Sequence, residues 1–77
     1  MDKLEKLYEL LAGIRPDVDF AAETKLVSDG ILDSFDIVAV VSEINDAYGV
    51  SIGVMDLLPE NFDSAEAMCK LIRERLK

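Results

Sequence analysis

Histidine and tryptophan are absent from the 77-residue sequence, and cysteine occurs once, as Cys69. The absence of histidine removes the commonest general base and metal ligand, and it excludes a Ser-His-Asp hydrolase. A single cysteine cannot form an internal disulfide, so nothing indicates an oxidising compartment. Because Cys69 follows Met68 on a helix that should pack on the core, we expect a buried or half-buried, inert thiol. These observations together predict that the protein is not an enzyme.

Basic residues are also scarce, with 8 Lys and Arg against 16 Asp and Glu, for a net charge of −8. This charge repels nucleic acid and anionic membranes and suits partners with Lys/Arg patches, although it could serve solubility alone. The sequence has no apolar run of membrane-spanning length and no segment that resembles a signal peptide. We therefore expect a cytoplasmic protein that neither binds nucleic acid nor inserts into membranes.

The many aspartates raise the possibility of a calcium loop, which needs oxygen ligands at alternating positions, a central glycine and a glutamate at the twelfth position. Neither Asp17-Val18-Asp19 nor the segment from Asp29 to Asp36 has this spacing. We therefore expect no metal site.

Hydrophobic residues make up 51% of the sequence, which is enough for the modest core of one small domain over residues 1–77. Apolar residues recur at helical spacing in three segments. The first helix is predicted from Asp2 to Leu11, the second from about Ser34 to Tyr48, and the third from Asp63 or Ser64 onward. The expected core residues are Leu4, Leu7, Tyr8, Leu11 and Ile14 of the first; Ile37, Val38, Val41, Ile44 and Tyr48 of the second; and Ala65, Met68, Leu71, Ile72 and Leu76 of the third.

Helix-capping and helix-breaking residues define the connections between these helices. Gly13 and Pro16 end the first helix, Gly49 caps the second, and the spacing of Asp63 and Glu66 suggests a capping box for the third. One helical turn is predicted for Met55–Leu58, stopped by Pro59, with Pro59-Glu60-Asn61 as a turn.

The segment from Arg15 to Asp33 shows no helical or strand periodicity in its apolar residues and is predicted to be a long loop. Its apolar residues should pin the loop to the helices, and Gly30 should supply a special backbone conformation. The expected pins are Phe20, Leu26, Val27 and Ile31. The predicted fold is an all-α four-helix bundle with three main helices, one short helix and a long first loop, and we expect a monomer.

The segment from Asp29 to Val38 joins this loop to the most apolar helix. Asp33 and Ser34 both favour helix N-caps, so the helix should begin there with Ser34 exposed. Unpaired N–H groups and the dipole at a helix N-terminus favour an anion, so a phosphodiester on the Ser34 hydroxyl would be well placed. An unmodified capping serine is the alternative interpretation of these residues.

The pattern Gly-x-x-Asp-Ser-Phe-Asp-x-Val, which begins at Gly30, resembles the Asp-Ser-Leu attachment motif of acyl carrier proteins. Length, acidity and helix order resemble the same family over nearly the whole chain. The resemblance implies that Ser34 carries 4′-phosphopantetheine taken from coenzyme A, whose thiol holds an acyl group as a thioester. It also implies that a phosphopantetheinyl transferase recognises Asp33, and that acyl- or aminoacyl-activating ligases and acyl-transferring enzymes are partners.

The motif departs from that of fatty-acid carriers, which usually have leucine where this chain has Phe35 and glutamate where it has Ala39. The segment from Gly30 to Phe35 is more similar to D-alanyl carriers and to stand-alone carriers of peptide-synthetase or polyketide systems. The cargo therefore stays open among fatty-acid, polyketide, non-ribosomal peptide and D-alanylation pathways.

Phe35 belongs to a second, outward stripe of the helix, with Ala39, Ser42 and Asp46, and is expected to contact partners. The alternative function is an acidic helical protein–protein interaction module without a prosthetic group.

Overall fold

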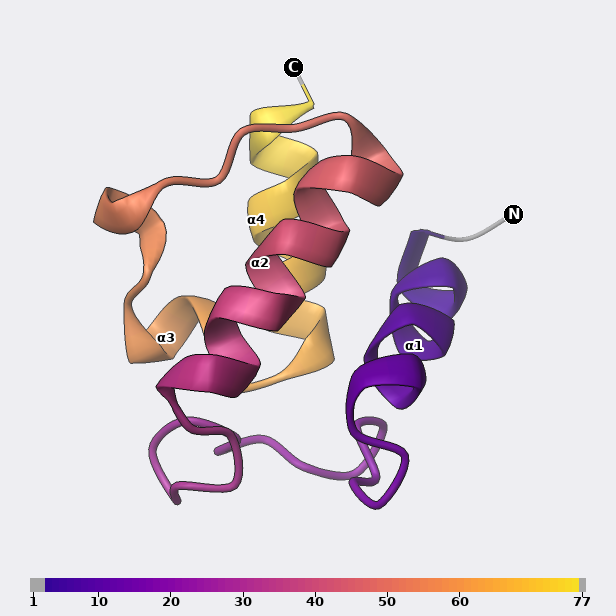
Figure 1. Ribbon diagram of the computed structural model, residues 1–77, viewed down its shortest axis with the longest axis vertical. Coiled ribbons are helices and arrows are strands. Elements are labelled where there is room, and N and C mark those ends of the chain that lie inside the picture. The colour runs from indigo at the N-terminus through magenta and orange to yellow at the C-terminus, as the bar shows by residue number, and fades with distance from the viewer. Residues whose placement is uncertain (1–2, 77) are drawn as a thin grey trace.

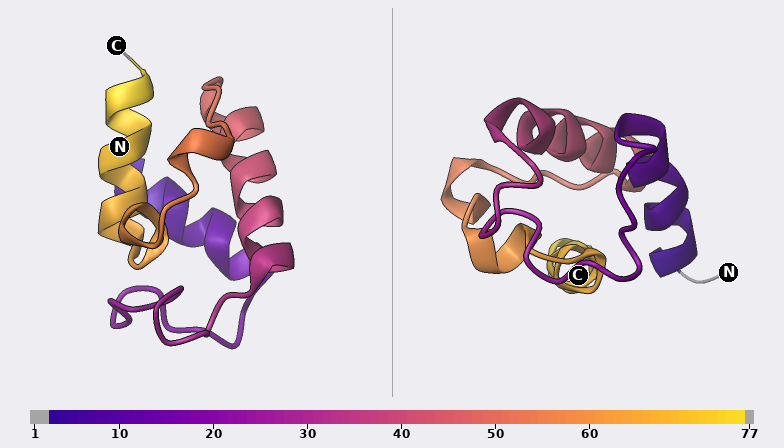
Figure 2. Two further views of the ribbon diagram at one scale, coloured as in Figure 1. Left: turned by 90° about the vertical axis from the view of Figure 1, so that its left-hand side faces the viewer. Right: turned by 90° about the horizontal axis from the view of Figure 1, so that it is seen from below.

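The computed structural model describes residues 3–76, and that part of the chain contains helices and no strand. The helices are α1 (Lys3–Ile14), α2 (Ser34–Tyr48), α3 (Pro59–Phe62) and α4 (Ala65–Arg75), with a 3₁₀ turn, η1, at Val54–Asp56. The three long helices surround one core, and the long first connection passes beneath them to the start of α2 (Figures 1 and 2). The predicted all-α bundle of three main helices and one short helix is confirmed. The predicted start of the first helix at Asp2 lies outside the described residues, and α1 continues past Leu11 to Ile14.

Each long helix contributes two side chains with no exposed surface to the core: Leu7 and Leu11, Val40 and Ile44, and Met68 and Ile72. Cys69 is buried as predicted, and no buried polar or charged residue occurs in the described part of the chain. Two of the loop residues predicted to be pins, Phe20 and Leu26, are buried, while Val27 and Ile31 are partly buried. The apolar periodicity therefore identified most of the core.

The prediction for the inward face of α2 was wrong at two residues. Val38 is 62% exposed, whereas Val40, which was not predicted to be core, is fully buried. Successive residues are separated by roughly 100° around a helix, so Val40 lies about 40° from Ile44 and Val38 about 120° from it, on the opposite side. The side of α2 that carries the fully buried Ile44 therefore includes Val40 and not Val38.

The predictions for the end of the chain also need correction. Leu76, expected in the core, is 42% exposed because it follows the last turn of α4. The helical turn expected at Met55–Leu58 lies at Val54–Asp56 instead, and the turn expected at Pro59–Asn61 is the beginning of α3. Pro59 does not stop a helix but starts one, because the first helical position needs neither an N–H donor nor a free φ.

Asp63 does not cap α4, contrary to the predicted capping box with Glu66. Ser64 is the N-cap, and its Oγ accepts a hydrogen bond from the Ala67 N–H at 3.0 Å. The Asp63 carboxylate instead accepts hydrogen bonds from the Ser28 hydroxyl at 2.7 Å and from the Ser28 and Val27 N–H groups at 2.8 and 2.9 Å. These bonds fasten the long first connection to the junction of α3 and α4, and they lower the pKa of Asp63 below its ordinary value.

The lowered pKa of Asp63 predicts a loss of stability in acid. The ionised carboxylate is bound more favourably in the folded chain, so its contribution is present above about pH 4 and is lost as the pH falls through the lowered pKa. Between about pH 5 and pH 3, the melting temperature should fall more steeply for the wild type than for Asp63→Asn. Asp46→Asn, at an exposed carboxylate on α2, should retain the steep wild-type slope. Equal slopes for the wild type and Asp63→Asn would contradict this role.

Candidate functional site at the start of helix α2

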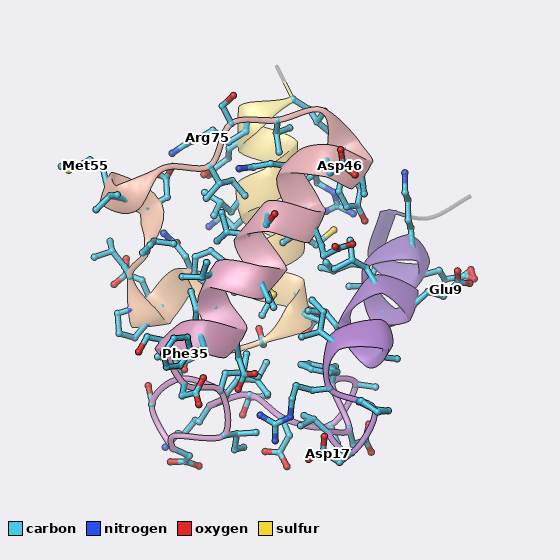
Figure 3. All side chains as sticks on the ribbon, viewed as in Figure 1. Glu9, Asp17, Phe35, Asp46, Met55 and Arg75 are labelled. Atoms are coloured by element: carbon cyan, nitrogen blue, oxygen red, sulfur yellow. The ribbon has the colours of Figure 1, made fainter. Side chains whose placement is uncertain are left out.

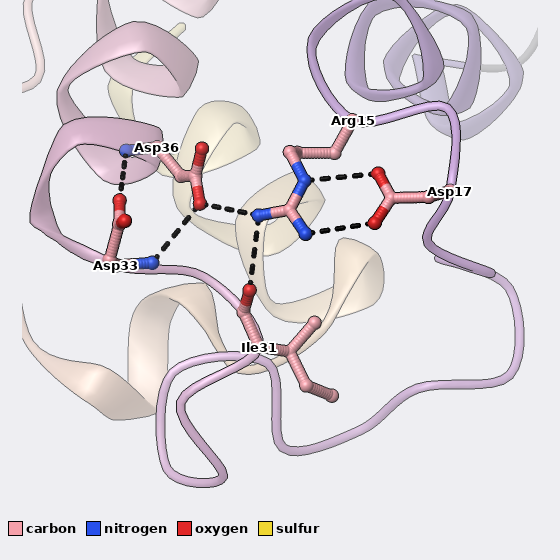
Figure 4. A network of polar contacts seen from close by, with 5 residues as sticks. All are labelled: Arg15, Asp17, Ile31, Asp33 and Asp36. Atoms are coloured by element: carbon pink, nitrogen blue, oxygen red, sulfur yellow. Dashed lines mark hydrogen bonds and ion pairs between the residues drawn. The ribbon is translucent and has the colours of Figure 1, made fainter.

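Helix α2 begins at Ser34 with a complete capping box, as Figure 4 shows. Asp33 is the N-cap, and its Oδ1 accepts a hydrogen bond from the Asp36 N–H at 2.9 Å. In return, Asp36 Oδ2 accepts a hydrogen bond from the Asp33 N–H at 3.2 Å. The predicted helix start and the capping role of Asp33 are confirmed, and Ser34 is the first helical residue rather than the cap.

The segment that precedes the cap is fixed on the body of the protein. Gly30 has φ 73°, a left-handed conformation that favours glycine, as predicted. The Leu32 N–H donates to Leu26 O at 2.9 Å, and the Leu26 N–H donates to Asp63 O at 2.8 Å. Leu32, which was not predicted as a pin, is 2% exposed. Ser34 therefore begins its helix two residues after a buried anchor.

Ser34 is exposed at the N-terminus of α2, where the chemistry suits a phosphodiester. Among residues 3–76, no acceptor pairs with the backbone N–H groups of Ser34 and Phe35. These donors and the helix dipole favour negative charge next to the Ser34 hydroxyl. The residues present therefore fit a covalently attached phosphate ester.

The other four serines have different surroundings. The Ser28 hydroxyl donates to Asp63, and the Ser64 hydroxyl oxygen caps α4. Ser42 is exposed in the middle of α2, and Ser51 is exposed on the extended link that follows it. None of these four serines stands at the first position of a long helix.

Arg15 contributes to this site, although the sequence analysis did not identify it. Its Nη1 donates to Asp36 Oδ2 at 2.6 Å and to Ile31 O at 3.2 Å. Its Nε and Nη2 donate to the two oxygens of Asp17 at 3.0 and 2.9 Å (Figure 4). This bidentate pairing lowers the pKa of Asp17, while Asp17 and then Asp36 raise the pKa of Arg15. No local signal reveals the contact with Asp36, because the two residues are 21 positions apart.

The outward side of α2 next to Ser34 is apolar. Phe35 is 85% exposed and points away from the core, as expected, and Val38 is exposed one helical turn further on. Figure 3 shows Phe35 at the lower end of α2 and Asp46 near the upper end. Asp36 has only 17% of its side chain exposed and is paired with Arg15, so it is not a free acid beside Phe35. The nearest helical surface to Ser34 thus offers apolar side chains, and the exposed acids Glu43 and Asp46 lie further along.

Comparison with known families identifies the class of protein that this fold and site define. The model of a family described as the phosphopantetheine attachment site matches residues 2–72. The chain therefore belongs to the phosphopantetheine-binding carrier family, and the predicted resemblance to acyl carrier proteins is confirmed. Neither the search of curated proteins nor the search of solved structures found a match.

Membership of this family defines the general chemistry. A serine of such a carrier holds 4′-phosphopantetheine covalently, and the terminal thiol of this group holds the acyl cargo as a thioester. Carriers of this family are not enzymes themselves; a phosphopantetheinyl transferase and acyl-handling enzymes act on them. No helix within residues 3–76 is long and apolar enough to cross a membrane.

Proposed function

We propose that Ser34 is the serine that carries 4′-phosphopantetheine and that residues 1–77 act as a single carrier domain. The observation that carries the proposal is the position of Ser34, exposed at the start of α2 beside the unpaired N–H groups of Ser34 and Phe35. In the modification, a bond forms between Ser34 Oγ and the phosphorus that bears the pantetheine. The phosphoanhydride bond of coenzyme A breaks, its nucleotide portion leaves, and the hydroxyl proton is released.

The loaded carrier would present an acyl or aminoacyl thioester to its partner enzymes. The segment from Gly30 to Phe35, with Phe35 and Ala39 in place of the leucine and glutamate usual in fatty-acid carriers, supports a D-alanyl or other stand-alone carrier. An acyl- or aminoacyl-activating ligase would load the thiol, and acyl-transferring enzymes would unload it. We place this exchange in the cytoplasm, with the carrier as a monomer.

Intact-mass measurement tests the proposed attachment. The purified chain is incubated with coenzyme A and a broad-specificity phosphopantetheinyl transferase, and the product is then fragmented to locate the added group. We expect one phosphopantetheine per chain, on the peptide that contains Ser34. An unchanged mass, or an added group on Ser28 or Ser42, would contradict the proposal.

Enzymes that act on a thioester tethered at Ser34 must dock beside it, where the Phe35 side chain is 85% exposed. Truncation of a central aromatic contact commonly costs 2 kcal/mol or more, whereas an exposed charge contributes about 0–1 kcal/mol. We therefore expect Phe35→Ala to lower kcat/KM with the cognate ligase by about thirtyfold. Asp46→Asn should lower it by less than about fivefold, and added salt should have a moderate effect.

The matched variant for Phe35→Ala is Asp46→Asn, because both residues are exposed on α2 and neither change opens a cavity. Circular dichroism should give the same helix content for both variants and the wild type. If Asp46→Asn is the more damaging change, or if salt abolishes the reaction, docking is mainly electrostatic and this account of α2 is wrong.

A further inference from the structure

Arg15 connects the end of α1 to the start of α2. It directly follows α1, and its N–H donates to Leu11 O at 2.9 Å, so its backbone continues the last turn of that helix. Asp17 binds Nε and Nη2 on one edge of the guanidinium group. This planar, bidentate contact orients the group so that the remaining nitrogen, Nη1, faces the segment that leads into α2.

The two acceptors of Nη1 lie on either side of Ser34 in the sequence. Ile31 O precedes the helix cap, and Asp36 belongs to the first turn of α2 (Figure 4). Asp36 Oδ2 accepts from Arg15 and also from the Asp33 N–H, so one oxygen connects the guanidinium group to the N-cap. Arg15 therefore contacts both ends of the six-residue turn from Ile31 to Asp36, which contains Asp33 and Ser34.

We propose that Arg15 is a positioning residue for the modification of Ser34, an inference that rests on the proposed function of Ser34. By fixing Ile31 and Asp36 at once, it restricts the turn to one conformation and so fixes the direction in which the Ser34 hydroxyl is presented to the transferase. Positional control of this kind acts on the chemical step, because a reacting group displaced by about 1 Å can react up to about a hundredfold more slowly.

The ion pair also affects the net charge of the carrier surface beside Ser34, where the transferase binds. Arg15 carries one positive charge and pairs with two carboxylates, Asp17 and Asp36, so the three side chains together carry a net charge of −1, and only 17% of the Asp36 side chain is exposed. Removal of Arg15 would leave that carboxylate uncompensated beside Ser34. A transferase with a basic docking surface would then bind the carrier no more weakly than before, while the hydroxyl would be less well placed.

Steady-state kinetics of loading distinguish positioning from a loss of stability. For Arg15→Gln, with coenzyme A saturating and well below the melting temperature, we expect kcat to fall about tenfold and KM for the carrier not to rise. Partial unfolding would have the opposite signature, because a smaller competent fraction raises the apparent KM and leaves kcat unchanged. Arg15→Lys keeps the charge but not the fork of donors, so we expect it to restore part of kcat.

Arg75→Gln is the matched control. It removes the same charge and also breaks an Arg–Asp ion pair, between Arg75 and Asp56, at the opposite end of the molecule from Asp17 (Figure 3). Its kcat should equal that of the wild type. Asp36→Asn weakens one of the two contacts of Nη1 and leaves the contact with Ile31 O. If Arg15 acts through both contacts, Arg15→Gln should still lower kcat when it is added to Asp36→Asn, but by a smaller factor than in the wild type.

Hydrogen exchange gives a readout that does not depend on the transferase. In Arg15→Gln, the Asp36 and Ile37 amides, which donate to Asp33, should exchange faster, while the Ile72 amide in the core of α4 should not. If the wild type is modified normally and kcat is unchanged in Arg15→Gln, the proposed role of Arg15 is wrong, while the proposed function of Ser34 stands. Absence of modification on Ser34 in the wild type would refute the proposed function, and with it this inference.

Discussion

Ser34→Ala should remain folded and should gain no mass from coenzyme A and a phosphopantetheinyl transferase. The hydroxyl oxygen is the only nucleophile that this position offers, so its removal should abolish loading rather than slow it. Ser42→Ala, at an exposed serine of the same helix, should be loaded like the wild type.

The same variant should leave stability nearly unchanged, because Asp33 rather than Ser34 caps α2. Surface substitutions without such a role usually change the free energy of unfolding by about 0.5 kcal/mol or less. Circular dichroism and thermal melting measure this effect. Loading that persists in Ser34→Ala would move the attachment to another serine, and a large loss of helix content would show that Ser34 has a structural role.

Ile44→Ala should have the largest effect on the fold. Ile44 is fully buried in α2, and truncation of such a side chain costs about 2–4 kcal/mol through lost burial and the cavity that remains. Small domains lie near the lower end of the usual stability range of about 5–15 kcal/mol, so this loss approaches the whole free energy of unfolding. We expect partial unfolding, measured as lost helical circular dichroism and a lower denaturation midpoint.

Val38→Ala is the matched control for Ile44→Ala. Val38 is also β-branched and lies on the same helix, but it is 62% exposed, so its truncation should change stability by about 0.5 kcal/mol or less. An unchanged midpoint in Ile44→Ala would contradict the observed core. Equal losses in the two variants would show that the outward side of α2 is packed as tightly as its inward side.

The features that the sequence predicted correctly depend on short-range interactions. The start of α2 at Ser34 and its end before Gly49 follow from capping residues within one turn of the helix. The exposure of Ser34 and Phe35 follows from their place at the helix start and on the outward stripe. The buried positions Leu7, Leu11 and Ile44 follow from apolar spacing, which favours one side of a helix whatever covers it.

The sequence by itself therefore determined the three long helices, most of the core and a candidate attachment serine. Helix geometry also favours Val40 over Val38 as a core residue, because Val40 lies about 40° from the buried Ile44 around the helix and Val38 about 120° from it. Tertiary structure alone decided the partners of the charged groups. Asp63 binds the first connection instead of capping α4, and Asp36 binds Arg15, which is 21 residues away in the sequence. A carboxylate accepts from any donor within reach, and which donor is within reach depends on how distant segments of the chain are packed together.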